Sequence, residues 1–150
     1  MKIRTDYVTN SSSSSFILGF KDELEIDDII NQLPPYWSED ARQSVVYDIK
    51  DGITSKESAV SFYKENLCEY WWRFHGKDWF DLSDNERNSY EYKSFIEAKR
   101  NNFVKELLDK LNENEIISIV EYEDHDGLGS ELEHNIMPYL DNTIERISHH

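Results

Sequence analysis

Four stretches of the chain concentrate β-branched and aromatic residues, and they predict strands. Such side chains fit the pleated, half-buried surface of a sheet. The predicted strands are residues 2–8, 14–20, 116–122 and 143–148. The stretch 116–122 has the highest β-branched content, so we expect it to be a central strand.

Apolar residues recur at helical spacing between these strands. A capping box that begins at Thr54 marks the start of one long helix, and a capping box that begins at Ser83 marks the start of the longest helix. Acidic residues precede a shorter first helix, and Pro34 ends it. The predicted helices are residues 22–33, 38–49, 54–75, 83–111 and 131–140.

The last three elements follow one another as strand, helix and strand within about 30 residues, the spacing of a crossover between parallel strands. Parallel strands would bring the loop after Tyr122 and the end of the chain to one end of the sheet. The sequence therefore predicts a single α+β domain over residues 1–150. We expect a small mixed β-sheet, a mostly helical insertion and a C-terminal strand-helix-strand unit.

Five consecutive serines precede the apolar stretch that begins at Phe16. A serine run is typical of a flexible linker. Here it lies between two predicted strands, so we interpret it as a polar loop attached to the sheet. The loop comprises Asn10, Ser11, Ser12, Ser13, Ser14 and Ser15.

The charge of the chain is strongly negative, with 31 acidic against 16 basic side chains and a net charge of −15. Such a chain repels nucleic-acid phosphate and anionic lipid, so we expect no direct nucleic-acid binding and no membrane association. The excess of negative charge either keeps the chain soluble or complements the positive charge of a basic protein partner. Cys68 is the single cysteine, and neither a signal peptide nor a membrane span is visible, so we expect a cytoplasmic protein.

Residues 121–134 contain six carboxylates, two imidazoles and no basic side chain. Aligned on its first glycine, this stretch partly resembles an EF-hand calcium loop. The matching positions are Asp124, Asp126, Gly127, Ser130 and Glu133. Tyr122 takes the place of the first carboxylate, and the preceding segment is a predicted strand, so an acidic solvated loop is the alternative.

Histidines supply a second candidate chemistry. Neutral imidazole together with carboxylate suits zinc, manganese or iron. The spacing does not match known zinc motifs, and exposed histidines without a metal are the alternative. The candidate ligands of a divalent metal are Asp124, Asp126, Glu133, His125, His134, His149 and His150.

The aromatic segment 70–80 contains adjacent tryptophans, Trp71 and Trp72. Neighbours on a helix point to different faces, so the two cannot both fill one core stripe. Either one of them faces a partner or the next helix, or the segment packs in the core, which is the favoured account because aromatic residues carry much of the buried area in small domains. No G-x-S-x-G, G-x-G-x-x-G or P-loop pattern is present, and the sequence identifies no catalytic residue.

The opening of the chain, residues 2–17, resembles the N-terminal TNSSSSSF signature of small uncharacterised bacterial and phage-associated proteins. Residues 129–134 and 145–150 are similar to segments of the same group. The resemblance implies no activity, cofactor or catalytic residue.

Taken together, these observations predict an acidic cytosolic interaction or regulatory protein, linked to mobile elements, that binds a protein partner. The alternative is a metal-binding module or metal-dependent enzyme that uses the acidic loop 121–134 with His149 and His150.

Overall fold

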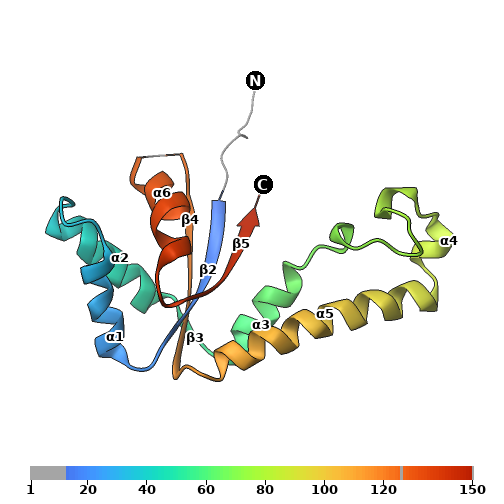
Figure 1. Ribbon diagram of the computed structural model, residues 1–150, viewed down its shortest axis with the longest axis horizontal. Coiled ribbons are helices and arrows are strands. Elements are labelled where there is room, and N and C mark those ends of the chain that lie inside the picture. The colour runs from blue at the N-terminus through green and yellow to red at the C-terminus, as the bar shows by residue number, and fades with distance from the viewer. Residues whose placement is uncertain (1–12, 126, 150) are drawn as a thin grey trace.

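A four-stranded sheet lies at the centre of the fold, in the strand order β3-β4-β2-β5 (Figure 1). The computed structural model describes residues 13–125 and 127–149. The strands are β2 (Ser13–Phe20), β3 (Ile53–Thr54), β4 (Ile116–Glu123) and β5 (Thr143–His149). These strands and the surrounding helices confirm the α+β class.

Every pairing among the described strands is antiparallel. The crossover from β4 to β5 does connect two parallel strands, but β2 lies between them and pairs with both. For this reason the sheet contains no parallel ladder in the described part of the chain, although a mixed sheet was expected. The N-terminal end of β2 consequently lies beside the C-terminal ends of β4 and β5.

One face of the sheet is covered by α1 (Glu23–Asp27), a 3-10 turn (Asp28–Gln32), α2 (Glu39–Asp51), α6 (Gly127–Glu131) and its π-helical continuation (Leu132–Ile136), and a second 3-10 turn (Met137–Tyr139) (Figure 1). The alternating residues Phe16, Leu18 and Phe20 of β2 form the core with these elements, and all three are fully buried. The predicted first two helices and the helix of the crossover are confirmed. The crossover helix begins at Gly127, four residues earlier than predicted.

The opposite face is covered by α3 (Lys56–Glu65) and α5 (Tyr90–Leu111). Ile17 of β2 and Ile117 of β4 pack there against Leu107 and Leu111 of α5. Because side chains alternate along a strand, β2 contributes to two separate cores. This explains why the sequence of β2 contains a continuous apolar run.

Residues 66–89 leave α3, run along α5 and form a lobe at its far end, away from the sheet (Figure 1). This aromatic lobe contains two 3-10 turns (Glu69–Trp71 and Trp79–Asp81) and α4 (Asp84–Arg87). It has its own small core, where Phe74 and Leu82 pack against Tyr92 and Ile96 of α5.

The lobe corrects two sequence predictions. The helix predicted to reach residue 75 ends at Glu65. Cys68 and Trp72 have extended backbone, with ψ values of 124° and 129°, which a helix cannot contain. The capping box at Ser83 is confirmed, but it opens the short α4, and Ser89 caps the long helix α5.

Two further predictions concern the N-terminal region. Residues 2–8, and the loop positions Asn10, Ser11 and Ser12, lie outside the described residues. Ser13, Ser14 and Ser15 belong to β2 and not to a loop, because their backbone groups pair with β4 and β5. None of the described helices is long and apolar enough to cross a membrane.

Candidate functional site

The serine end of β2 carries polar side chains to both faces of the sheet. Ser14 is fully buried and lies opposite Tyr122 of β4 and Ser148 of β5. Ser15 is also buried and pairs with the neighbouring residues of the same strands, so its side chain points to the other face.

On the α6 face, Ser14 contacts a buried carboxylate. The Ser14 hydroxyl donates to Oε1 of Glu133 at 3.0 Å, and the Glu133 side chain is fully buried. Arg146 of β5 donates from Nε to Ser14 Oγ at 3.2 Å, and its terminal nitrogen lies 3.7 Å from the same Glu133 oxygen. A buried carboxylate is tolerated when it has hydrogen bonds and an opposite charge, and these two side chains provide both.

Glu133 also belongs to a group of three potential metal ligands. Asp124, Glu133 and His134 each offer one ligand atom, and these atoms lie within 4.8 Å of one another. His134 Nε2 lies 3.6 Å from an Asp124 oxygen and 3.7 Å from Glu133 Oε2. The side chain of His134 is 42% exposed, so the group opens to solvent on the histidine side.

Two elements bring these ligands together. Asp124 directly follows β4, whereas Glu133 and His134 are consecutive residues of the π-helical segment after α6. Single π-helical turns inside helices occur frequently at functional sites. The predicted crossover runs from β4 through this helical segment to β5. It therefore places the Asp124 carboxylate, at the end of β4, beside Glu133 and His134.

The opposite face carries a second polar group, made of Ser15, His149 and Glu121. Ser15 Oγ lies 3.0 Å from His149 Nε2 and donates to Glu121 Oε2 at 3.3 Å, and the same Nε2 lies 3.7 Å from Glu121. In a Ser-His-acid triad the acid contacts Nδ1 and the serine contacts Nε2. Here both groups approach Nε2 and the serine is buried, so the geometry is not that of a hydrolase triad.

The candidate histidines are consequently not gathered at one place. His134 lies in the ligand group, and His125 Nδ1 lies 2.9 Å from Glu123 instead. His149 lies on the other face of the sheet, against Ser15. Asp126 and His150 lie outside the described residues. The expected metal site, which joined the acidic loop 121–134 to His149, is therefore divided between the two faces of the sheet, because consecutive strand residues point in opposite directions.

The EF-hand interpretation does not agree with the backbone. Gly127–Glu131 is helical, and Glu133 lies in the π-helical segment that follows. In an EF-hand, residues at these positions belong to a loop that wraps around the ion. The acidic stretch thus contributes ligands from a turn and a helix.

A cavity of about 350 Å³ lies beside this region, between α2, the end of β4 and α6. Its lining includes Asp48, Glu121, Glu123 and Tyr122. The Tyr122 hydroxyl donates to Asp48 Oδ2 at 3.1 Å. Burial, followed by the charge of Asp48, raises the pKa of Tyr122 well above its usual value.

Arg146 was not identified from the sequence as part of the site. Its position could have identified it, because Arg146 is the only lysine or arginine after Lys110 and lies in a predicted strand. No family model, no curated protein and no solved structure matches this chain. The interpretation of the site accordingly depends on its own geometry.

Proposed function

We propose that the chain binds a divalent transition-metal ion through Asp124, Glu133 and His134. The observation that supports this function is the approach of three ligand atoms, from two separate elements, to within 4.8 Å of one another. Ligands at about 2.0–2.2 Å from a metal lie roughly 3 to 3.5 Å apart, so closing the 3.6 and 3.7 Å pairs requires a small movement.

The ligand types favour zinc, manganese or iron over calcium or magnesium. Calcium and magnesium prefer oxygen ligands alone, whereas an imidazole nitrogen with two carboxylates suits the transition metals. Three protein ligands leave further coordination positions for water or a substrate, as in catalytic zinc sites. The exposed side of His134 is where such positions would lie.

Ser14 and Arg146 would act on this metal through Glu133. Ser14 donates to Oε1 of Glu133, and Arg146 donates to the Ser14 hydroxyl and lies near the same carboxylate oxygen. His134, in contrast, is nearest to Oε2. Groups that hold a ligating carboxylate typically alter metal affinity by about 10–100-fold. The competing account is a structural role, in which Glu133 simply completes a buried polar network.

Titration calorimetry of tag-free protein with Zn²⁺ and Mn²⁺ tests the proposal. We expect one ion per chain, and a loss of at least about tenfold in affinity for His134→Gln and for Asp124→Asn. His125→Gln is the matched control, because it removes a neighbouring histidine that pairs with Glu123. The proposal fails if His125→Gln and His134→Gln weaken binding equally, or if neither ion binds stoichiometrically.

A protein partner is the second candidate function, and exposed aromatic side chains in the lobe favour it. Trp71 is 62% exposed, the preceding Tyr70 is 53% exposed, and Phe80, whose ring stacks on Tyr70, is 73% exposed. Trp72, in contrast, stacks on Phe103 at 5.6 Å between ring centroids. Exposed tryptophan and tyrosine are typical of interface residues, and the net charge of −15 suits a basic partner.

Affinity capture with Trp71→Ala and Tyr47→Ala variants tests this second function. Tyr47 is 68% exposed on α2 and controls for loss of an exposed aromatic ring elsewhere. We expect Trp71→Ala alone to lose a basic protein that is captured by the unmodified chain and released by salt. Equal capture by both variants would contradict the assignment of the partner surface to the lobe.

A further inference from the structure

A second cavity, of about 440 Å³, is lined by residues of the aromatic lobe and of α5. The lobe lies far from α6 and the end of β4, the part of the fold that carries the metal ligands (Figure 1). Three of its lining residues are basic, namely Arg87, Lys93 and Arg100, and two are acidic, Glu69 and Glu97. This balance is the reverse of that in the whole chain, where acids outnumber bases by 31 to 16. The cavity is therefore a locally cationic site in a strongly anionic protein.

Three hydrogen-bond donors in the cavity lining lack an acceptor among the described residues. They are the hydroxyl of Tyr92 and the Nε–H groups of Arg87 and Arg100, and all three atoms are buried. The Tyr92 residue is only 4% exposed. Buried donors without acceptors are uncommon because they have lost water without gaining a partner. A group that carries acceptor oxygens would satisfy them.

The two carboxylates of the lining already have donors of their own. Glu69 accepts from the indole N–H of Trp79 at 2.9 Å, and Glu97 accepts from Lys64 Nζ at 3.2 Å. The Trp79 N–H, which also lies close to Tyr92, is thus directed to Glu69. Because these two carboxylates already accept hydrogen bonds from other donors, they compete less with an incoming anion for the donors of the cavity.

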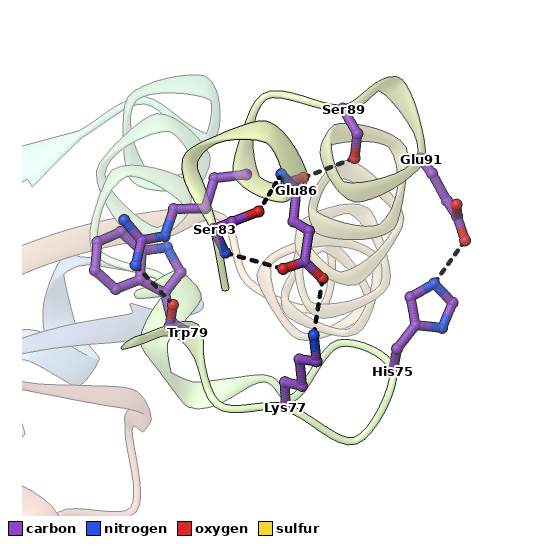
Figure 2. A network of polar contacts seen from close by, with 8 residues as sticks. His75, Lys77, Trp79, Ser83, Glu86, Ser89 and Glu91 are labelled. Carbon is purple, nitrogen blue, oxygen red and sulfur yellow. Dashed lines mark hydrogen bonds and ion pairs between the residues drawn. The ribbon is translucent and has the colours of Figure 1, made fainter. Parts of the chain in front are cut away.

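Arg87 is held in position by the protein. Its guanidinium lies 3.9 Å from the centroid of the Trp79 ring and donates to the Trp79 carbonyl at 3.1 Å. Figure 2 shows the contacts that fix this part of the lobe, with Ser83 and Glu86 bonded to each other and Lys77 bonded to Glu86. A side chain that is fixed before binding loses less conformational entropy when a ligand arrives.

Arg100 approaches the cavity from α5. One of its terminal nitrogens donates to the carbonyl of Leu67 at 3.5 Å. Lys93 of the same helix is exposed at the cavity and makes no ion pair within the described ranges. The site thus combines two guanidinium groups, a free amine and a hydroxyl with the apolar side chains of Ile96 and Trp79.

We propose that this cavity binds a small organic anion whose carboxylate or phosphate oxygens accept from Tyr92, Arg87 and Arg100. Guanidinium groups suit both kinds of anion, because their donors match two oxygens at once. The apolar part of the ligand packs against Ile96 and Trp79. This site is separate from the proposed metal site, and neither depends on the other.

Benzoate and phenyl phosphate are suitable probes, and benzyl alcohol is a neutral control of similar shape. Binding is followed by the NMR signal of the Trp79 indole N–H during titration of the full chain. We expect both anions to shift this signal saturably, with a higher Kd as salt is raised, and benzyl alcohol to bind at least about tenfold more weakly. Whichever anion binds more tightly identifies the carboxylate or the phosphate as the preferred group.

Two variants and one control variant distinguish a binding role from a structural one. Arg100→Gln is expected to raise the Kd at least about tenfold, whereas Arg42→Gln, which removes another buried Nε–H on α2, leaves it unchanged. Tyr92→Phe removes a hydroxyl for which the described part of the chain supplies no acceptor, so it is expected to weaken anion binding without lowering the melting temperature.

Three results would overturn the proposal. The first is that millimolar benzoate and phenyl phosphate leave the Trp79 signal unmoved. The second is that benzyl alcohol binds as tightly as the anions. The third is that Tyr92→Phe, which is expected to fold normally, binds the anions like the unmodified chain.

Discussion

Ser14 and Ser15 are consecutive residues of β2, yet their hydroxyls serve opposite faces of the sheet. Ser14 donates to the buried Glu133 at 3.0 Å, whereas Ser15 lies 3.0 Å from the imidazole of His149. Both hydroxyls are buried where apolar side chains would ordinarily stand. Serine at these positions therefore has a specific physical role, which is to supply a short hydroxyl to a carboxylate on one face and to a histidine on the other.

Ser14→Ala is expected to destabilise the fold. The substitution removes a donor to a fully buried carboxylate, and leaving such a group poorly satisfied costs about 1–3 kcal/mol. Urea unfolding followed by tryptophan fluorescence measures the change. Ser13→Ala in the half-buried preceding position is the control and is expected to stay within about 0.5 kcal/mol. Equal stability of both variants would mean that Arg146 alone satisfies Glu133.

Glu86 is expected to titrate below its ordinary pKa of 4.5. The backbone N–H of Ser83 donates to its carboxylate at 2.9 Å, and Lys77 Nζ lies 3.2 Å away, and both favour the charged form (Figure 2). Because the pKa is lowered on folding, the contribution to stability is present above 4.5 and is lost as the pH falls through the lowered value.

Carbon-detected NMR titration of the Glu86 carboxyl measures this midpoint. Lys77→Gln should raise the midpoint only part of the way to 4.5, because the Ser83 backbone bond remains. Lys105→Gln, an exposed substitution on α5, should leave it unchanged. A midpoint at or above 4.5 in the unmodified chain would show that the capping box is open in solution.

Local signals were sufficient to predict most elements of the sheet and helices. The β-branched run at 116–122 became β4, and the capping box at Ser83 was confirmed by its hydrogen bonds. The sequence failed where the aromatic spacing continued past a turn. Tyr70, Trp71 and Phe74 continue the helical spacing, but Phe74 is buried in the lobe's own core and none of the three belongs to α3.

The candidate site could be predicted only in part, for a geometric reason. Asp124, Glu133 and His134 come from the acidic stretch that was singled out, and the structure brings them together. His149 was expected beside them, but its assignment to a face depends on the register of β5 on β2. A shift of one residue in register moves every side chain to the other face. The sequence prediction concerned the end of the sheet that the segments share, and it did not assign His149 to a face.

Gly52→Ala is expected to be strongly destabilising. A Cβ atom at this position would lie 2.2 Å from the carbonyl oxygen of Ile119, which belongs to the backbone of β4 and cannot move aside cheaply. Gly52 also ends α2, and its carbonyl accepts from the Ile119 N–H at 3.0 Å. Forced overpacking of this kind costs about 1–3 kcal/mol or more.

Chemical denaturation of Gly52→Ala beside Gly127→Ala tests this steric account. Apart from its chain neighbours and the backbone of its own helix, none of the described residues has an atom within 4 Å of a Cβ at Gly127, so that substitution in α6 should be neutral or stabilising. If the two substitutions have the same effect, the close approach of α2 to β4 is not maintained in solution.

Tyr122→Phe is expected to change the pH dependence of stability at the alkaline end. The buried Tyr122 hydroxyl donates to Asp48, and burial raises its pKa above the ordinary 10.0. The folded chain therefore holds this proton more tightly than the unfolded chain does. Its contribution is complete below pH 10.0 and is lost as the pH rises toward the raised pKa.

Denaturant unfolding of both proteins between neutral pH and about pH 11 measures this effect. At neutral pH, Tyr122→Phe should be about 1 kcal/mol less stable, because Asp48 loses a hydrogen bond. Above pH 10.0 the difference should shrink, since only the unmodified chain must keep Tyr122 protonated in order to fold. Tyr63, whose pKa burial raises to about 12, is present in both proteins and cancels. A difference that stays constant with pH would mean that Tyr122 is open to solvent and titrates normally.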